Sequence, residues 1–81
     1  MGAPQEVTDD ELLAAVRTHK DPAVTANDIA DRVGLTSQAV NKRIPRLVEE
    51  GYLRKKEVGA AAVVYWLTES GRERVFASES V

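Results

Sequence analysis

Only two residues, Gly34 and Leu35, separate the expected end of one amphipathic helix from the start of the next. Thr25 begins the earlier helix, because a threonine hydroxyl can accept hydrogen bonds from the unpaired amides of a first helical turn. Gly34 ends it, because glycine readily adopts the positive φ found just past a helix. Thr36 begins the next helix in the same way, over residues 37–50. Two helices joined through such a short glycine turn form a compact supersecondary unit, which restricts the possible folds more than any other feature.

A third helix precedes this pair, and a fourth lies at the end of the sequence. Thr8 and Glu11 have the spacing of a capping box, which predicts a helix over about residues 9–20. Thr68 is the expected cap of the last helix, which covers about residues 69–78. The chain is therefore expected to be mainly α.

After Gly51 the hydrophobic period changes from helical to alternating. The segments 52–58 and 62–67 are rich in valine and aromatic residues, which predicts two strands joined by a turn at Gly59. Residues 23–25 are short and extended, and they could add a third strand. The expected sheet is thus a hairpin of two or three strands.

Apolar residues recur at helical spacing within residues 37–50, so one face of this helix is expected to pack on the core. They are Val40, Ile44, Leu47 and Val48. The opposite face and its flanks carry Gln38, Asn41, Lys42, Arg43, Pro45, Arg46 and Glu49. Pro45 lies deep inside the helix and has no amide hydrogen to donate, so we expect a kink or a tightening of the last turns.

The segment from Val24 to Glu73 resembles the winged helix-turn-helix regulators of bacteria and archaea. The resemblance covers about two-thirds of the chain and includes "VGL" before the recognition helix, "LVEEGYL" at its end and "LTESG" after the second strand. It implies a winged helix-turn-helix fold with a three-helix core, a wing of two or three strands and an extra C-terminal helix. We expect one domain over residues 1–81, with residues 1–7 and 79–81 flexible.

The charge is unevenly distributed, although the formal net charge is only -2. Residues 36–56 hold six basic side chains against two acidic ones, whereas residues 1–35 hold three basic and seven acidic side chains. The basic residues are Lys42, Arg43, Arg46, Arg54, Lys55 and Lys56. A basic segment on an otherwise acidic chain favours an anionic partner for that segment.

The resemblance implies that helix 37–50 enters the major groove of DNA and that the wing, residues 52–67, follows the backbone. Amide and guanidinium side chains can read base edges, and free amides at a helix start suit a phosphate oxygen. The turn 58–61 carries no basic residue, so the wing is expected to contact the backbone through its first strand. The expected DNA-binding residues are Thr36, Ser37, Gln38, Asn41, Lys42, Arg43, Arg46, Arg54, Lys55 and Lys56.

Other classes of function find little support in the sequence. The chain has no cysteine and one histidine, and it has no glycine-rich phosphate loop, so we expect no enzyme, no catalytic or metal site and no cofactor. His19 is interpreted as a residue at a helix end, and Arg72 and Arg74 as local partners of nearby glutamates. The chain has no apolar run of about 18 residues and no visible signal peptide, so we expect no membrane association and a cytoplasmic location.

The first expectation is a sequence-specific regulator of transcription, most simply a repressor, that binds double-stranded DNA as a homodimer. Its dimer would use the terminal helices, with two apolar faces: Val75 and Phe76 on one, and Leu12, Leu13 and Val16 on the other. No small-molecule effector is evident. The alternative is a winged-helix module that docks proteins and binds no nucleic acid. A third possibility, a binder of single strands, is weakened by an aromatic content of only 5%.

Overall fold

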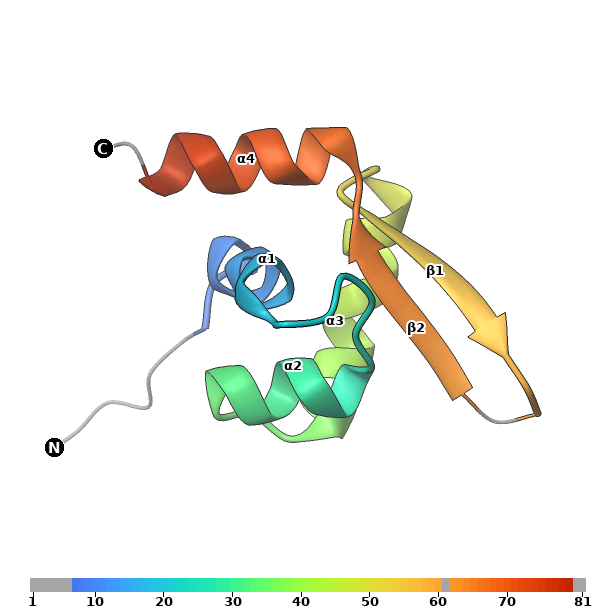
Figure 1. Ribbon diagram of the computed structural model, residues 1–81. Helices are drawn as coiled ribbons and strands as arrows, with labels where there is room; N and C mark the ends of the chain where they lie inside the picture. Colours follow the sequence, from blue (N-terminus) through green and yellow to red (C-terminus); the bar gives the residue numbers. More distant parts are fainter. Residues whose placement is uncertain (1–6, 61, 80–81) are drawn as a thin grey trace, which may run out of the picture.

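The computed structural model describes residues 7–60 and 62–79, and over them the chain forms four helices and one antiparallel hairpin (Figure 1). The helices are α1 (Asp9–Thr18), α2 (Ala26–Val33), α3 (Ser37–Glu49) and α4 (Glu69–Glu79). The strands are β1 (Leu53–Val58) and β2 (Ala62–Leu67). This is the predicted winged helix-turn-helix architecture, with a two-stranded wing and an extra C-terminal helix.

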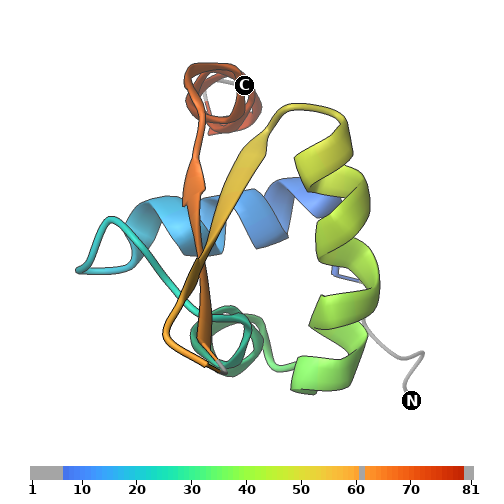
Figure 2. The ribbon, with the colours of Figure 1, turned by 90° about the vertical axis from the view of Figure 1, so that its right-hand side faces the viewer.

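The helices α4, α1 and α2 lie one above another, with α1 between the other two in both views (Figures 1 and 2). The helix α3 crosses beside them, and the hairpin projects from the helical body. Of the termini expected to be flexible, residues 1–6 and 80–81 lie outside the described residues. Val7 packs against the core, and Glu79 ends α4.

Threonine caps fix the starts of the first two helices, as their spacing predicts. The Thr8 hydroxyl accepts from the Glu11 amide at 3.2 Å, and the Glu11 carboxylate accepts from the Thr8 amide at 2.9 Å. Thr25 and Asp28 make the same reciprocal pair at 3.1 and 3.0 Å. Each such box satisfies two amides that the helix itself leaves unpaired. The first helix ends at Thr18, two residues before the expected end, because the next residue has an extended backbone.

The short turn between α2 and α3 also forms as predicted. Gly34 has φ 79° and its amide donates to the Ala30 carbonyl at 2.8 Å, while the Leu35 amide donates to the same carbonyl at 3.0 Å. A side chain at Gly34 would strain this left-handed conformation. The glycine turn therefore sets the direction in which α3 leaves α2.

Pro45 does not interrupt α3, which is continuous from Ser37 to Glu49. Its side chain lies on the exposed face, where the ring does not displace core residues. The tighter bonding expected near the helix end occurs after Glu49, where the Gly51 amide donates to the Val48 carbonyl at 3.0 Å. Gly51, at the end of this turn, has a φ of 87°, the left-handed conformation that is common just past a helix.

The hairpin pairs Leu53 with Leu67 at its base and Val58 with Ala62 near its tip. The expected third strand is reduced to one bridge, in which Val24 and Tyr65 exchange backbone hydrogen bonds of 2.9 and 2.7 Å. A longer strand cannot form there because α2 already begins at Ala26. This bridge attaches the wing to the loop between α1 and α2.

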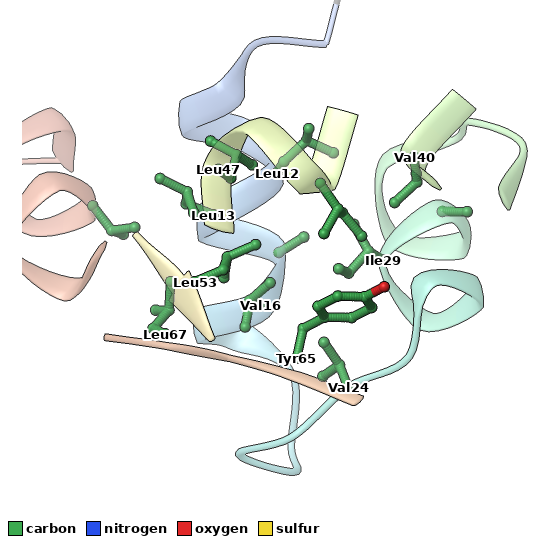
Figure 3. Close-up of a cluster of buried hydrophobic side chains, with 14 residues drawn as sticks. Leu12, Leu13, Val16, Val24, Ile29, Val40, Leu47, Leu53, Tyr65 and Leu67 are labelled. Atoms are coloured by element: carbon green, nitrogen blue, oxygen red, sulfur yellow. The ribbon is translucent and has the colours of Figure 1, made fainter. Parts of the chain in front are cut away.

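Every described helix and both strands contribute to one hydrophobic core (Figure 3). Tyr65 and Leu67 are buried and Trp66 is half-buried, in line with the alternation along a strand. The largest side chains that are almost wholly buried are Leu12, Leu13, Ile29, Leu47, Val24, Val40 and Val75. Burial of one such leucine or valine contributes about 1.5–3 kcal/mol.

Two parts of the expected dimer surface are therefore inside the monomer. Leu12, Leu13 and Val16 pack in the core, so the prediction that they offer a second apolar face is wrong. Val75 is wholly buried as well. Phe76 is the exception, since 67% of its surface is exposed on α4.

The start of α4 is locked against the end of α3. The Thr68 hydroxyl accepts from the Gly71 amide at 3.0 Å and donates to the Gly51 carbonyl. A β-carbon at Gly71 would lie far inside van der Waals distance of the Tyr52 carbonyl oxygen, so only glycine fits at this close approach. The start of the C-terminal helix is thus held against the residues that follow α3.

Candidate nucleic-acid interface

The core-facing stripe of α3 determines which of its side chains reach the surface. Val40, Ile44 and Leu47 are buried, so the helix must turn its other face outward. That face exposes Gln38, Asn41, Lys42, Pro45, Arg46 and Glu49. The structure therefore brings together two amides and two cations on one exposed helical surface.

The beginning of α3 presents backbone donors beside hydroxyl groups. The Thr36 hydroxyl accepts from the Ala39 amide at 3.1 Å, and the first helical hydrogen bond runs from the Val40 amide to the Thr36 carbonyl. The amides of Ser37 and Gln38 precede these bonds and point along the positive end of the helix dipole. A phosphate oxygen suits such a position, and the half-buried Ser37 lies beside it.

Arg43 has a different environment from the other predicted binding residues. Its side chain is 34% exposed and donates to the Asp9 carboxylate at 2.7 Å and to the Val7 carbonyl. These contacts join α3 to the start of α1. Arg43 is thereby placed to hold the helix in position, while its neighbours on α3 face solvent.

Arg46 lies on the exposed face, and 71% of its side chain is accessible. Its guanidinium is close to two carboxylates, with Nη2 3.4 Å from Asp9 and Nε 3.6 Å from Glu50. Asp9 thus contacts both arginines, and it is a residue that the sequence did not mark as part of the site. The pairs join residues 34 and 37 positions apart in the chain, so no local spacing signals them.

The strand pairing divides the three basic residues of the wing between its two faces. Lys55 is opposite Tyr65, so it shares the face on which Tyr65 packs toward the helices. Arg54 and Lys56 are opposite Trp66 and Val64, on the outer face. All three are exposed, but only Lys55 is on the side of the wing that faces the helical body.

A polar groove of about 510 Å³ lies between the start of α2, α3 and β2. Its polar wall is formed by Thr25, Asn27, Ser37, Asn41 and Tyr65. Burial raises the pKa of the Tyr65 phenol, which therefore remains a neutral hydroxyl. Hydroxyl and amide groups of this kind can donate to phosphate and sugar oxygens.

Asn27 and Tyr65 are additions to the predicted site. Asn27 has an exposed amide side chain in the first turn of α2. Its position in the sequence did not distinguish it from other surface residues. Tyr65 belongs to the core and also lines the groove. At the tip, residues 58–60 carry no charge, and Ala61 lies outside the described residues.

His19, Arg72 and Arg74, which the sequence analysis did not assign to DNA, make contacts in other parts of the fold. Nδ1 of His19, at the end of α1, accepts from the Asp21 amide at 3.1 Å. Arg72 approaches the Leu67 carbonyl at 3.4 Å, and Arg74 pairs with Asp10 of α1. The expectation that Arg74 pairs within its own helix is therefore wrong, because packing brings a carboxylate of α1 closer.

Neither a metal cluster nor a transmembrane helix is found in the part of the chain that the structure describes. Within residues 7–60 and 62–79, no three potential metal-ligating side chains come together. None of the helices formed there is long and apolar enough to cross a membrane.

Comparison with known proteins places this surface in context. A family model described as winged helix-turn-helix DNA-binding matches residues 12–54. An uncharacterized protein of Methanocaldococcus jannaschii is 31% identical over 71 residues, which are 88% of this chain and 25% of that protein. The chain thus spans a quarter of the length of this relative.

Solved structures with the same fold include a transcription regulator and a protein in complex with operator DNA. MepR, a transcription regulator of the Staphylococcus aureus multidrug efflux pump MepA, has a TM-score of 0.77 and 23% identity, over 93% of this chain and 57% of its own. A variant of MarR from E. coli, complexed with operator DNA, has a TM-score of 0.75 and 16% identity, over 88% of this chain and 51% of its own. Each likeness covers little more than half of the longer protein.

Proposed function

Because this chain belongs to the winged helix-turn-helix DNA-binding family, we propose that it binds double-stranded DNA sequence-specifically and regulates transcription. The observation that carries the proposal is the exposed face of α3, where Gln38, Asn41, Lys42 and Arg46 lie opposite the buried stripe. A helix of this kind fits the major groove, where every base pair presents a distinct pattern of donors and acceptors.

The side chains of α3 divide naturally between reading bases and binding phosphates. Arg46 can donate two hydrogen bonds to guanine, and Gln38 can pair with adenine. Asn41 and Lys42 lie between them on the same surface. Thr36 and Ser37, at the positive end of the helix, are assigned to a phosphate oxygen. Replacing Gln38 or Arg46 by alanine should cost about 1–3 kcal/mol on a cognate duplex and less on random DNA.

In addition to α3, the wing and the polar groove are assigned contacts with the DNA backbone. Lys55 is on the inner face of the wing, and the groove between α2, α3 and β2 offers Thr25, Asn27 and Tyr65. We assign these side chains to phosphates and sugars, which position a protein on the duplex without reading its sequence. Arg54 and Lys56 reach the same backbone only by extending around the wing from its outer face.

The active form is proposed to be a homodimer, with α4 as its contact and a repressor as its simplest role. Phe76 supports this assignment because 67% of a large apolar side chain is exposed on a helix at the edge of the domain. A twofold interface would bury Phe76 from both copies. Sedimentation of the purified protein and of Phe76→Ser at tens of micromolar tests the interface. The wild type should be a dimer and the variant a monomer, and a monomeric wild type would contradict it.

Salt dependence of binding to duplex DNA tests the central proposal. If about four basic side chains meet phosphates, log K against log salt should have a slope of roughly -3 to -4. The duplex should be selected from a randomised pool by the protein itself, with a scrambled duplex of equal composition as control. A slope near zero, or equal affinity for both duplexes, would overturn sequence-specific DNA binding and favour a protein-docking module.

A further inference from the structure

We propose that Asp9, a residue of α1, restrains Arg46 and thereby determines how strictly α3 discriminates between DNA sequences. The inference rests on the proposed DNA-binding function and adds a specificity residue outside the helix-turn-helix unit. It is carried by one carboxylate that spans two arginines on successive turns of α3. Oδ1 of Asp9 accepts from Arg43 at 2.7 Å, and Oδ2 lies 3.4 Å from Nη2 of Arg46.

Arg43 fixes the carboxylate in place. The Asp9 side chain is only 16% exposed, and Arg43, 34% exposed, also donates to the Val7 carbonyl. A charged pair with this degree of burial and an additional backbone acceptor holds its geometry better than a pair on the open surface. The position of Asp9 is therefore set by Arg43 and not by Arg46.

Arg46 is held from two sides but remains accessible. Asp9 approaches Nη2, and Glu50 approaches Nε from one turn later on α3. The exposed fraction of 71% leaves the outer edge of the guanidinium toward solvent. A guanidinium that is already oriented loses less side-chain freedom when it forms the planar, two-bond contact with guanine.

The same carboxylate opposes contacts that carry no sequence information. A phosphate that approached Arg46 in a wrong register would also approach the negative charge of Asp9, which repels it. Guanine is uncharged and does not suffer this repulsion. Asp9 thus weakens non-specific binding more than specific binding, which is how an unfavourable element produces discrimination.

The test compares the ratio of affinities for the selected and the scrambled duplex in wild type and Asp9→Asn. The variant should bind the scrambled duplex several-fold more tightly than wild type does. Its ratio of affinities for the selected and the scrambled duplex should therefore be about 3- to 10-fold lower. Asp21→Asn is the matched control, because it removes the same charge from an exposed position in the loop after α1. An equal effect of the two variants would show a general charge effect and overturn the proposal.

Two further variants separate restraint of Arg46 from loosening of the fold. In the Arg46→Gln background, Asp9→Asn should leave the ratio unchanged, because the restrained side chain is gone. Arg74→Met breaks the contact of α1 with α4 through Asp10 but leaves Asp9, Arg43 and Arg46 unchanged, so it should lower the melting temperature and keep most of the ratio. If Arg74→Met reproduced the loss of discrimination, loosening of the fold would be responsible and the proposal would be wrong.

The outcomes also distinguish this inference from the proposed function. If the wild-type protein bound no duplex, both the proposed function and the role of Asp9 would be refuted. A wild-type protein that preferred the selected duplex, with an unchanged ratio in Asp9→Asn, would leave the DNA-binding function intact and remove only the role of Asp9.

Discussion

Nε of Arg74 donates to Oδ1 of Asp10 at 2.7 Å, a bond that joins the last helix to the first across 64 positions of the sequence. The guanidinium also lies over the ring of Tyr52, with 4.8 Å from its carbon to the ring centre. The hydrogen bond to Asp10 raises the pKa of Arg74. With Asp9 bound to α3 and Asp10 to α4, the first turn of α1 connects both flanking helices.

Replacing Arg74 by methionine should therefore destabilise the fold although the residue is on the surface. The side chain is one-third exposed, so screening limits the loss from the ion pair and the ring contact together to about 1–2 kcal/mol. Arg72→Met is the control, since the guanidinium of Arg72 makes a long contact of 3.4 Å with the Leu67 carbonyl. Urea denaturation measures both variants, and equal losses would contradict the role assigned to Asp10.

Gly71→Ala tests the close approach of α4 to the end of α3. In an ordinary helix this change would stabilise by about 1 kcal/mol. Here the new methyl group meets the Tyr52 carbonyl and the Leu67 side chain, so we expect a net loss of about 1–3 kcal/mol. The exposed neighbour substitution Ser70→Ala should be nearly neutral by the same thermal melting. A stabilised Gly71→Ala would mean that α4 sits farther from Tyr52.

Asp28 should make the stability of the helix-turn-helix unit depend on pH in the acid range. The backbone hydrogen bond from Thr25 lowers the pKa of Asp28 below its ordinary value of 3.8. Its stabilisation is therefore complete above 3.8 and is lost as the pH falls through the lower pKa of the folded protein.

The measurement is the free energy of unfolding of wild type and Asp28→Ala at several pH values. The two should differ by roughly 0.5–1 kcal/mol near neutral pH, as for a partly screened capping contact, and should converge in acid. Asn27→Ala, a neutral change on the same turn, should shift the free energy by the same amount at every pH. A difference for Asp28→Ala that stayed constant into acid would refute the assignment.

Lys55→Ala and Arg54→Ala should affect DNA binding unequally, because strand pairing places them on opposite faces of the wing. The lysine faces the helical body, so its loss should weaken selected and scrambled duplexes alike and reduce the magnitude of the salt slope by about one. Arg54→Ala should have a smaller effect on both quantities. Fluorescence anisotropy over a range of salt concentrations measures them, and the reverse order would place the DNA on the outer face.

The sequence was sufficient for the parts of the fold that local chemistry controls. Thr8, Thr25 and Thr36 each cap a helix through residues only three positions away, and Gly34 needs nothing beyond its own backbone freedom. These interactions lie within one turn of the chain, so their spacing predicts them. The alternation of the buried Tyr65 and the half-buried Trp66 likewise follows from the two-residue period of a strand.

The long-range contacts could not be predicted in this way. Acidic residues such as Asp9 and Asp10 are favourable in the first turn of a helix without any further partner, and Arg74 was interpreted as a local partner of nearby glutamates. Their actual partners are set by how the helices pack, which no spacing within a single helix reveals. Leu12 was misassigned to a dimer surface for the same reason, since its helical face is covered by the fold itself.

The glycine at the start of α4 has a consequence for how operators could change during evolution. At Gly71 the helix α4 approaches the Tyr52 carbonyl so closely that no side chain fits between them, which gives the start of α4 a defined place beside the segment that follows α3. In a dimer joined through α4, the distance between two DNA-reading helices would depend in part on this contact. Surface substitutions on α4 that leave the contact in place would change how tightly two copies associate more readily than they change the half-site spacing, which is about 34 Å for each turn of DNA. Operators of such a regulator could drift in base sequence far more readily than in length.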